Sequence, residues 1–185
     1  AEEEQFGCHC VADMLQRLSA AHLQLCRGQG AELLWQRGQR LLRPTDALTI
    51  AARKTAPAFE AALYCGLRAA GAEIPDQALR RFSLYLGQAY QALNDLDDWT
   101  ADDGNKLALG RDVISARPTI LRAFALQAGG GEALARLTHE TDLQALVEGV
   151  RALYSVLGVF ERADALVAAL RRRADQHKQL ANAAP

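Results

Sequence analysis

Carboxylate and amide side chains recur at helical spacing between residues 88 and 102. Gln88, Gln91, Asp95, Asp98 and Asp102 are three or four residues apart, so a continuous helix would place them on one face. Carboxylates at this spacing repel one another. A divalent cation offsets that repulsion, and Mg²⁺ favours one or two carboxylates completed by water and phosphate oxygens. The pattern therefore predicts a site for Mg²⁺ and a diphosphate.

A solvated acidic helix end is the other interpretation of these residues, and spacing alone does not separate the two. A basic group upstream favours the phosphate site. Lys54 and Thr55 lie just before Pro57, and a proline inside a helix removes a backbone donor and disturbs the turn before it. We therefore expect a kink or break near Lys54-Thr55, where the free amides of a new helix would hold a phosphate together with Lys54.

Further basic residues follow the acidic cluster. Lys106, Arg111 and Arg117 are spaced along a polar, glycine-containing stretch that is typical of a loop. From there they can meet the oxygens of a metal-bound diphosphate. We therefore predict a site that binds or ionises a diphosphate through metal. It would be formed by the acidic helix face, by Lys54 at the expected kink and by the basic residues of this loop. Such a site works by electrostatics and needs no nucleophile.

The composition predicts that packed helices position these residues. The chain has 185 residues, of which 50% are hydrophobic, mostly Ala and Leu, and 23% are charged, which favours a single all-α domain over residues 1–185. The formal net charge of −1 favours neither nucleic acid nor an anionic membrane as a partner. No apolar stretch approaches the roughly 20 residues of a membrane span, so a cytoplasmic protein is expected.

Apolar residues at helical intervals, interrupted by glycine or proline, predict the individual helices. Gly28 and Gly30 are expected to end the first helix, Pro118 to open the fifth, and Gly129-Gly130-Gly131 to close it. The predicted helices cover 11–26, 31–42, 45–71, the segment through 79–93 that ends in the acidic cluster, 118–128, 143–157 and 163–170.

Taken in order, the motifs resemble those of the trans-isoprenyl diphosphate synthases, or polyprenyl synthetases. The family's GQxxDL, KTG or KTA, FQxxDDxxD and GxD…GKPT segments correspond to residues 28–33, 54–56, 90–98, 110–112 and 117–119. The third of these is the family's second aspartate-rich motif. The ordered set is far more specific than any one of its members.

The resemblance implies antiparallel helices around a central cavity, Mg²⁺ as the cofactor, and usually a dimer. The family ionises an allylic diphosphate, joins the carbocation to the double bond of isopentenyl diphosphate and removes a proton. The implied residues fall into four overlapping groups: catalytic Lys54, Thr55, Gln91, Asp95 and Asp98; metal-binding Asn94, Asp95, Asp98 and Asp102; diphosphate-binding Lys54, Thr55, Gln91, Lys106, Arg111 and Arg117; and Phe59, Tyr64, Leu86 and Tyr90 as candidates for the cavity wall or for plain core packing.

Three departures from the family pattern limit what the chain is expected to do alone. Asn94 replaces the first aspartate of the second motif, and Ala116-Arg117 replaces a Gly-Lys pair. The family's first aspartate-rich motif lies upstream of GQxxDL, where this chain has only Asp13. We therefore expect the C-terminal part of an enzyme, without its N-terminal helices or with the first motif supplied by a partner chain.

Two alternatives stay open from the sequence. Asn94, Asp98 and Asp102 at intervals of four are similar to the Asn/Ser/Glu metal triad of class I terpene cyclases, which ionise an allylic diphosphate without isopentenyl diphosphate. The chain can also be a non-catalytic or regulatory subunit of a heteromeric prenyl synthase. The Lys-Thr and Arg-Pro-Thr segments favour the synthase over the cyclase.

Overall fold

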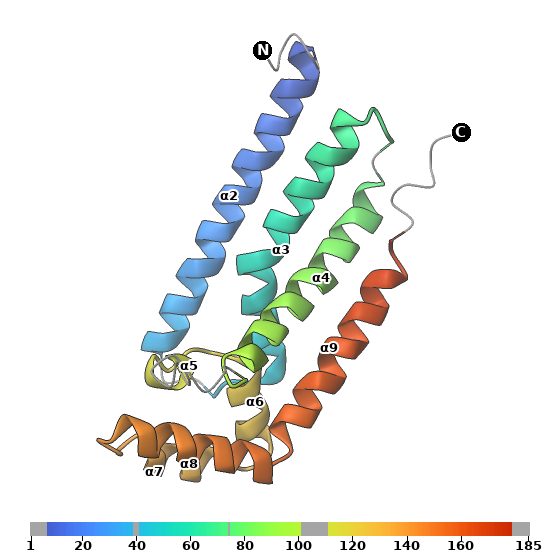
Figure 1. Ribbon diagram of the computed structural model, residues 1–185. Coiled ribbons are helices and arrows are strands. Elements are labelled where there is room, and N and C mark those ends of the chain that lie inside the picture. The colour runs from blue at the N-terminus through green and yellow to red at the C-terminus, as the bar shows by residue number, and fades with distance from the viewer. Residues whose placement is uncertain (1–6, 39–40, 74, 101–110, 179–185) are drawn as a thin grey trace.

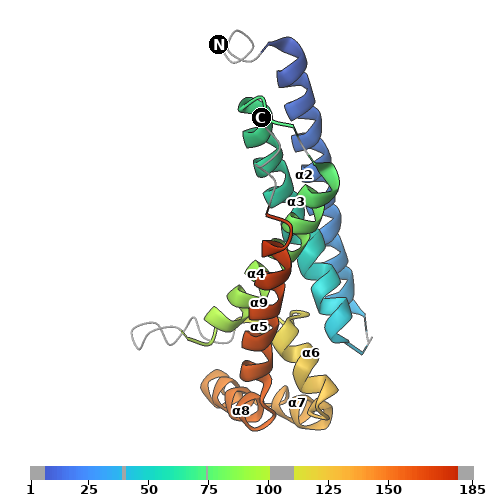
Figure 2. The same cartoon turned by 90° about the vertical axis from the view of Figure 1, so that its right-hand side faces the viewer.

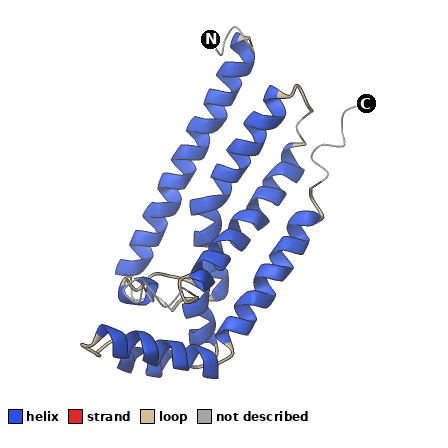
Figure 3. Cartoon of the chain, in the orientation of Figure 1, coloured by secondary structure: helices blue, strands red, loops and turns tan. Residues whose placement is uncertain are grey.

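The computed structural model describes residues 7–38, 41–73, 75–100 and 111–178, with the side chains of Arg111 and Ile114 excepted. Every regular element in these ranges is a helix and none is a strand (Figure 3). The all-α fold predicted from the sequence is therefore confirmed.

Four long helices form a layer in which neighbours run antiparallel (Figure 1). In spatial order they are α2 (Cys8–Arg37), α3 (Pro44–Ala69), α4 (Asp76–Asp97) and α9 (Val159–Asp175). Shorter helices gather at one end of the layer, and Figure 2 shows the molecule from its side. These are α5 (Arg111–Ile114), α6 (Ile120–Gln127), α7 (Gly131–Leu137) and α8 (Leu143–Val156).

The main hydrophobic core lies at the end of the layer where the short helices gather. It joins the C-terminal part of α4 to α6, α8 and α9. Trp99 packs against Tyr154 and Phe160, with ring centroids 5.3 to 5.9 Å apart. Because Trp99 follows the acidic cluster directly, this packing fixes the end of α4 from which the candidate site residues project.

Helix α2 continues through both glycines that were predicted to end it, so the expected helix 11–26 and the first part of the expected helix 31–42 are one element, which ends at Arg37 and not at residue 42. The close approach of α3 explains Gly28: a Cβ atom there would lie 2.5 Å from the backbone carbonyl of Arg53. A Cβ at Gly30 would meet nothing within 4 Å. Gly28 is thus a packing glycine at a helix contact and not a helix terminator.

Helix α3 also continues through Pro57. Of the kink or break predicted near Lys54, the break does not occur, whereas Figure 1 shows the helix bending in its middle. Consequently no free helix amides lie beside Lys54. The helix starts one residue earlier than predicted, with Pro44 in its first turn, where a proline needs no hydrogen-bond acceptor. The Asp46 carboxylate accepts from the Arg43 N–H at 3.1 Å and completes the cap.

The other predicted helices are present, but α5 and α7 were not predicted, and Pro118 lies before the Thr119 cap of α6 instead of opening that helix. Helices α8 and α9 occupy the two segments predicted at 143–157 and 163–170, and Gly158 between them has a φ of 63°. The chain turns at Gly129 but then forms α7, which the sequence pattern did not predict. In the described ranges no single helix is long and apolar enough to span a membrane, and only the bent pair α8 and α9 passes that test jointly.

Candidate active site

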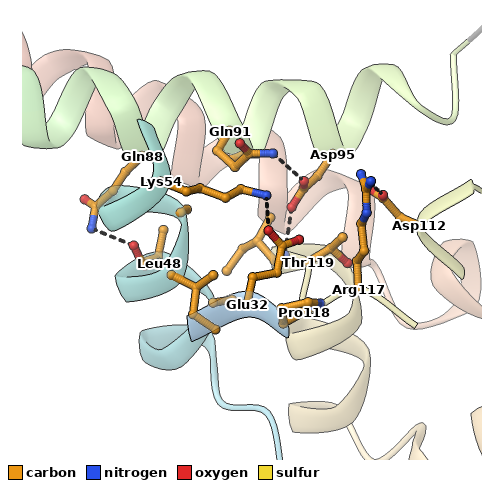
Figure 4. Close-up of a pocket in the computed structure, with 15 residues that line it drawn as sticks. Glu32, Leu48, Lys54, Gln88, Gln91, Asp95, Asp112, Arg117, Pro118 and Thr119 are labelled. Carbon is orange, nitrogen blue, oxygen red and sulfur yellow. Dashed lines mark hydrogen bonds and ion pairs between the residues drawn. The ribbon is translucent and has the colours of Figure 1, made fainter. Parts of the chain in front are cut away.

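Residues from several parts of the chain surround one cleft beside the C-terminal half of α4 (Figure 4). The cleft has about 20 Å³ of free space, which is room for about one water molecule. Its polar side chains come from α2, α3, α4, α5 and the segment before α6, and they are Glu32, Lys54, Gln88, Gln91, Asp95, Asp112, Arg117 and Thr119.

Lys54 reaches the cleft from α3 and forms an ion pair with Glu32 of α2. The Lys54 Nζ and Glu32 Oε2 atoms are 3.0 Å apart, and the two side chains are 18% and 5% exposed. Gly28 lies one turn before Glu32 and permits the close contact of α2 with the backbone at Arg53 and Lys54. The glycine and the glutamate therefore act together, since Gly28 lets the two helices come close and Glu32 neutralises the partly buried ammonium group of Lys54.

Asp95 points from α4 into the cleft and is 5% exposed. One carboxylate oxygen accepts from the Ile120 backbone N–H at 2.9 Å, and the other accepts from Gln91 Nε2 at 3.4 Å. Burial raises the pKa of Asp95 to about 7, with a further contribution from the charge of Asp112, while the Ile120 and Gln91 bonds oppose the shift. Asp95 thus links α4 to the first turn of α6.

Gln91 connects Asp95 to α3. Its Oε1 lies 3.4 Å from Thr55 Oγ1, which donates to it, and Gln91 Nε2 donates to Asp95. One turn earlier, Gln88 Nε2 donates to the backbone carbonyl of Leu48 at 3.3 Å. The amide groups on this face of α4 therefore tie α3 and α4 together on both sides of Lys54.

Asp112 of α5 and Arg117, which follows α5 in the sequence, also line the cleft. Arg117 Nη1 is 3.0 Å from Asp112 Oδ1, and the Asp112 N–H donates to Asp98 at 3.4 Å. Burial and the nearby charge of Asp98 raise the pKa of Asp112, and Arg117 opposes that shift. Ala116 has a φ of 50°, a left-handed conformation that favours glycine, which gives the family's glycine at this position a physical reason.

Of the four residues predicted as metal ligands, Asn94, Asp95 and Asp98 lie in the described part of the chain, and their surroundings differ. Asn94 is exposed, Asp98 is half-buried, and both oxygens of Asp95 are bonded to protein donors. Asp102 and Lys106 lie outside the described residues, as does the side chain of Arg111. No group of three or more His, Cys, Asp or Glu that could hold a metal ion occurs within the described ranges. Asn94 and Asp98 have the oxygen chemistry that Mg²⁺ requires.

The residues predicted as candidates for the cavity wall lie away from this cleft. Phe59 and Tyr90 contact each other edge to face, with centroids 5.6 Å apart. The Tyr64 hydroxyl donates to Asp13 at 2.6 Å, and Leu86 is half-buried. None of the four is among the residues that line the cleft.

Sequence reasoning missed three polar residues that line the cleft: Glu32, Asp112 and Thr119. Each lies inside a segment that resembles a family motif, and that resemblance could have identified it as a candidate site residue. What the sequence did not show was that both basic residues would have a carboxylate of the same chain as partner. Lys54 is held by Glu32 and Arg117 by Asp112, so an incoming anion must compete with these pairs.

Several solved structures of isoprenoid synthases have the same fold. A crystal structure of a geranylgeranyl pyrophosphate synthase superimposes with a TM-score of 0.84 and 17% identity, covering 96% of this chain and 57% of that one. A polyprenyl synthetase from Streptomyces coelicolor A3(2) gives a TM-score of 0.80 and 21% identity, covering 92% and 54%. A T. brucei farnesyl diphosphate synthase complexed with a bisphosphonate gives 0.80 and 18%, covering 94% and 55%.

The chain therefore spans little more than half the length of these structures. Comparison with curated protein sequences found no significant match. The family model for polyprenyl synthetase matches residues 5–155, a range that contains every residue of the cleft. The chain belongs to the polyprenyl synthetase family.

Proposed function

We propose that this chain supplies one wall of the active site of an Mg²⁺-dependent prenyltransferase, which condenses an allylic diphosphate with isopentenyl diphosphate. One observation carries the proposal: Lys54, Gln91, Asp95 and Arg117 line the same cleft although they come from three segments far apart in the sequence. These segments resemble the family's motifs in the correct order, and the family model spans all of them.

In this proposal Lys54 and Arg117 bind the diphosphate of the allylic substrate. Phosphate oxygens replace the carboxylates of Glu32 and Asp112, which pair with the two cations in this structure. Gln91 and Thr55 add hydrogen bonds to the same group. Charge-assisted bonds of this kind are about twice as strong as neutral ones, and they act where negative charge develops on the leaving group.

Asn94 and Asp98, with Asp102, are the proposed Mg²⁺ ligands of this chain. When bound, the ion would neutralise the diphosphate as it leaves. Asp95 is also a proposed ligand, but its oxygens must first release the Ile120 N–H and Gln91. Asn94 contributes no charge, so a site built from these residues alone would bind Mg²⁺ weakly, and we propose that a first aspartate-rich motif on another segment completes it. Dimer formation and a cytoplasmic location remain predictions.

A product assay on the complete protein tests the proposal. With Mg²⁺, an allylic diphosphate and isopentenyl diphosphate, mass spectrometry should detect an isoprenyl diphosphate longer than the allylic substrate by one or more isoprene units. Lys54→Gln and Asp98→Ala should each lower kcat/KM by at least about 100-fold, as expected for groups that act on the transition state. The control is Arg172→Gln, an exposed residue of α9 outside the cleft, which should retain full activity. Equal activity in all variants would refute the proposal.

A non-catalytic subunit is the second candidate, because both cations of the cleft are paired with carboxylates of the same chain. It predicts no turnover by this protein alone and a change in the activity of a partner synthase. The cyclase alternative predicts release of pyrophosphate from the allylic diphosphate when isopentenyl diphosphate is omitted. The same assay, run with and without isopentenyl diphosphate, separates these outcomes.

A further inference from the structure

A second cavity lies next to the cleft and shares Asp112, Arg117 and Thr119 with it. It has about 20 Å³ of free space, which is room for one water molecule or one ion of similar size. The proposed function gives no role to Arg122, Thr138 or Tyr154, which line this second cavity but not the cleft. We call it the Arg122 cavity, and these six residues are the ones that bear on its occupant.

Arg122 of α6 brings to the Arg122 cavity a positive charge that the described part of the chain does not balance. Its Nε–H is buried without a hydrogen-bond partner, and no described carboxylate forms an ion pair with its guanidinium group. The Arg122 backbone N–H donates to Thr119 Oγ1 at 3.2 Å, which fixes the first turn of α6 from which the side chain projects. A partly buried cation without a partner is costly, so this group should take a partner from solution.

Tyr154 of α8 adds a hydroxyl group to the same cavity. The residue is 2% exposed, and its ring packs against Trp99 and Phe160. No hydrogen bond joins its hydroxyl to another residue in the described ranges. Burial raises the pKa of Tyr154 well above its usual range, and the charge of Arg122 is the largest influence in the opposite direction, as expected if the two groups are close. The hydroxyl therefore keeps its proton and is available as a donor.

The polar lining of the Arg122 cavity favours an anion. Two arginines and three hydroxyl-bearing residues border it together with a single carboxylate, Asp112, which Arg117 already neutralises at 3.0 Å. One positive charge is therefore left without a partner. N–H and O–H donors are available around a space that suits a single atom, and charge-assisted hydrogen bonds are the strong ones.

We propose that the Arg122 cavity binds one small monovalent anion, chloride, between the Arg122 guanidinium group and the Tyr154 hydroxyl. A water molecule is the other occupant of suitable size, but it would leave the charge of Arg122 unbalanced. Bound chloride would connect α6 to α8. This inference goes beyond the proposed function and does not depend on it, because the cavity needs neither a diphosphate nor Mg²⁺.

Thermal unfolding in sodium chloride and in sodium gluconate of equal ionic strength tests for the site in solution. A ligand that binds only the folded state raises Tm, and gluconate is too large for the free space. The Tm in chloride minus the Tm in gluconate should therefore be at least about 2 °C larger for the natural protein than for Arg122→Gln. Each protein is compared with itself in two salts, so any loss of stability caused by the substitution cancels.

Two further variants separate the cavity from general effects of salt. Tyr154→Phe keeps the packed ring but removes the hydroxyl, and it should lower the difference between the two salts as Arg122→Gln does. Arg136→Gln changes an exposed arginine of α7 that does not line the cavity, and it should behave as the natural protein does. An equal difference between the salts in all four proteins would show that no chloride binds here and would overturn the inference.

Crystals soaked in sodium bromide locate the anion directly, because bromide replaces chloride and scatters anomalously. We expect an anomalous peak in the Arg122 cavity, in contact with Arg122 and Tyr154, and no peak there in crystals of Arg122→Gln. Peaks only at exposed arginines, with water in the cavity, would mean an adventitious ion only and would overturn the inference. A carboxylate of Asp112 that has moved onto Arg122 would also overturn it. Neither measurement uses pyrophosphate or prenyl transfer, so the proposed function stands or falls separately.

Discussion

At the scale of single residues, each cation of the cleft is held by a carboxylate that competes with any anionic ligand. The Glu32–Lys54 pair is the more buried of the two, and the Arg117–Asp112 pair is more open to solvent. Removing one member of a buried pair leaves an uncompensated charge, which costs stability. The same change also frees the remaining member to bind a ligand, so stability and ligand affinity should change in opposite directions.

Glu32→Gln tests this competition. We expect the free energy of unfolding to fall by about 1–3 kcal/mol, because Lys54 keeps its charge with a weaker partner. Affinity for pyrophosphate should rise, because the competing carboxylate is gone. Urea unfolding and calorimetric titration measure the two effects. A loss of pyrophosphate affinity would mean that Glu32 takes part in binding. The variant Glu60→Gln, which changes a residue outside the cleft, serves as the control.

Asp95 should make stability depend on pH. Its pKa is raised from 3.8 to about 7 in the folded protein, so between these values the folded state binds more protons than the unfolded state. The natural protein should therefore lose stability relative to the Asp95→Asn variant as pH rises through this range, and the difference should level off above the folded pKa. Thermal unfolding in EDTA at several pH values measures it. A pH-independent difference would show that Asp95 titrates normally.

At the scale of elements, two glycines set the helix contacts that form the cleft. Gly28 lets α2 approach α3, and Gly87 lets α4 approach Ala56 of α3, where an added Cβ would lie 2.8 Å from backbone atoms. Both contacts lie close to Lys54. The glycines therefore determine how near Glu32 and Gln91 come to the lysine, although neither glycine lines the cleft itself.

Gly28→Ala and Gly30→Ala form a matched pair within one helix. The first places a methyl group against the Arg53 carbonyl and should destabilise the protein by about 1–3 kcal/mol, as overpacking does. The second meets nothing within 4 Å and should stabilise the helix by about 0.5–1 kcal/mol. Urea unfolding of both variants is the measurement. Equal effects would mean that α2 and α3 are not in close contact at Gly28.

At the scale of the whole molecule, the sequence predicted the fold class and most of the groups around the cleft. Helical periodicity was sufficient to predict α4, α8 and α9. The resemblance of the ordered motifs to the family predicted that Lys54, Gln91, Asp95 and Arg117 share one site, and all four line the cleft. The continuity of α2 was not predictable, because the need for Gly28 arises from Arg53, which is distant in sequence.

The inward position of Asp95 escaped prediction for a similar reason. Spacing placed it on one face with Asp98, but its burial depends on the Ile120 N–H, which a separate helix supplies.

Binding of Mg²⁺-pyrophosphate, measured by isothermal titration calorimetry, tests whether Lys54 and Arg117 hold a diphosphate in this cleft. We expect one site on the chain, with affinity lowered at least about tenfold by Lys54→Gln and by Arg117→Gln, because each variant removes a charge-assisted bond worth about 1.5–3 kcal/mol. Arg172→Gln should bind as the natural protein does. Equal affinity in the natural protein and all three variants, or no binding by the natural protein, would show that Lys54 and Arg117 do not form a diphosphate site.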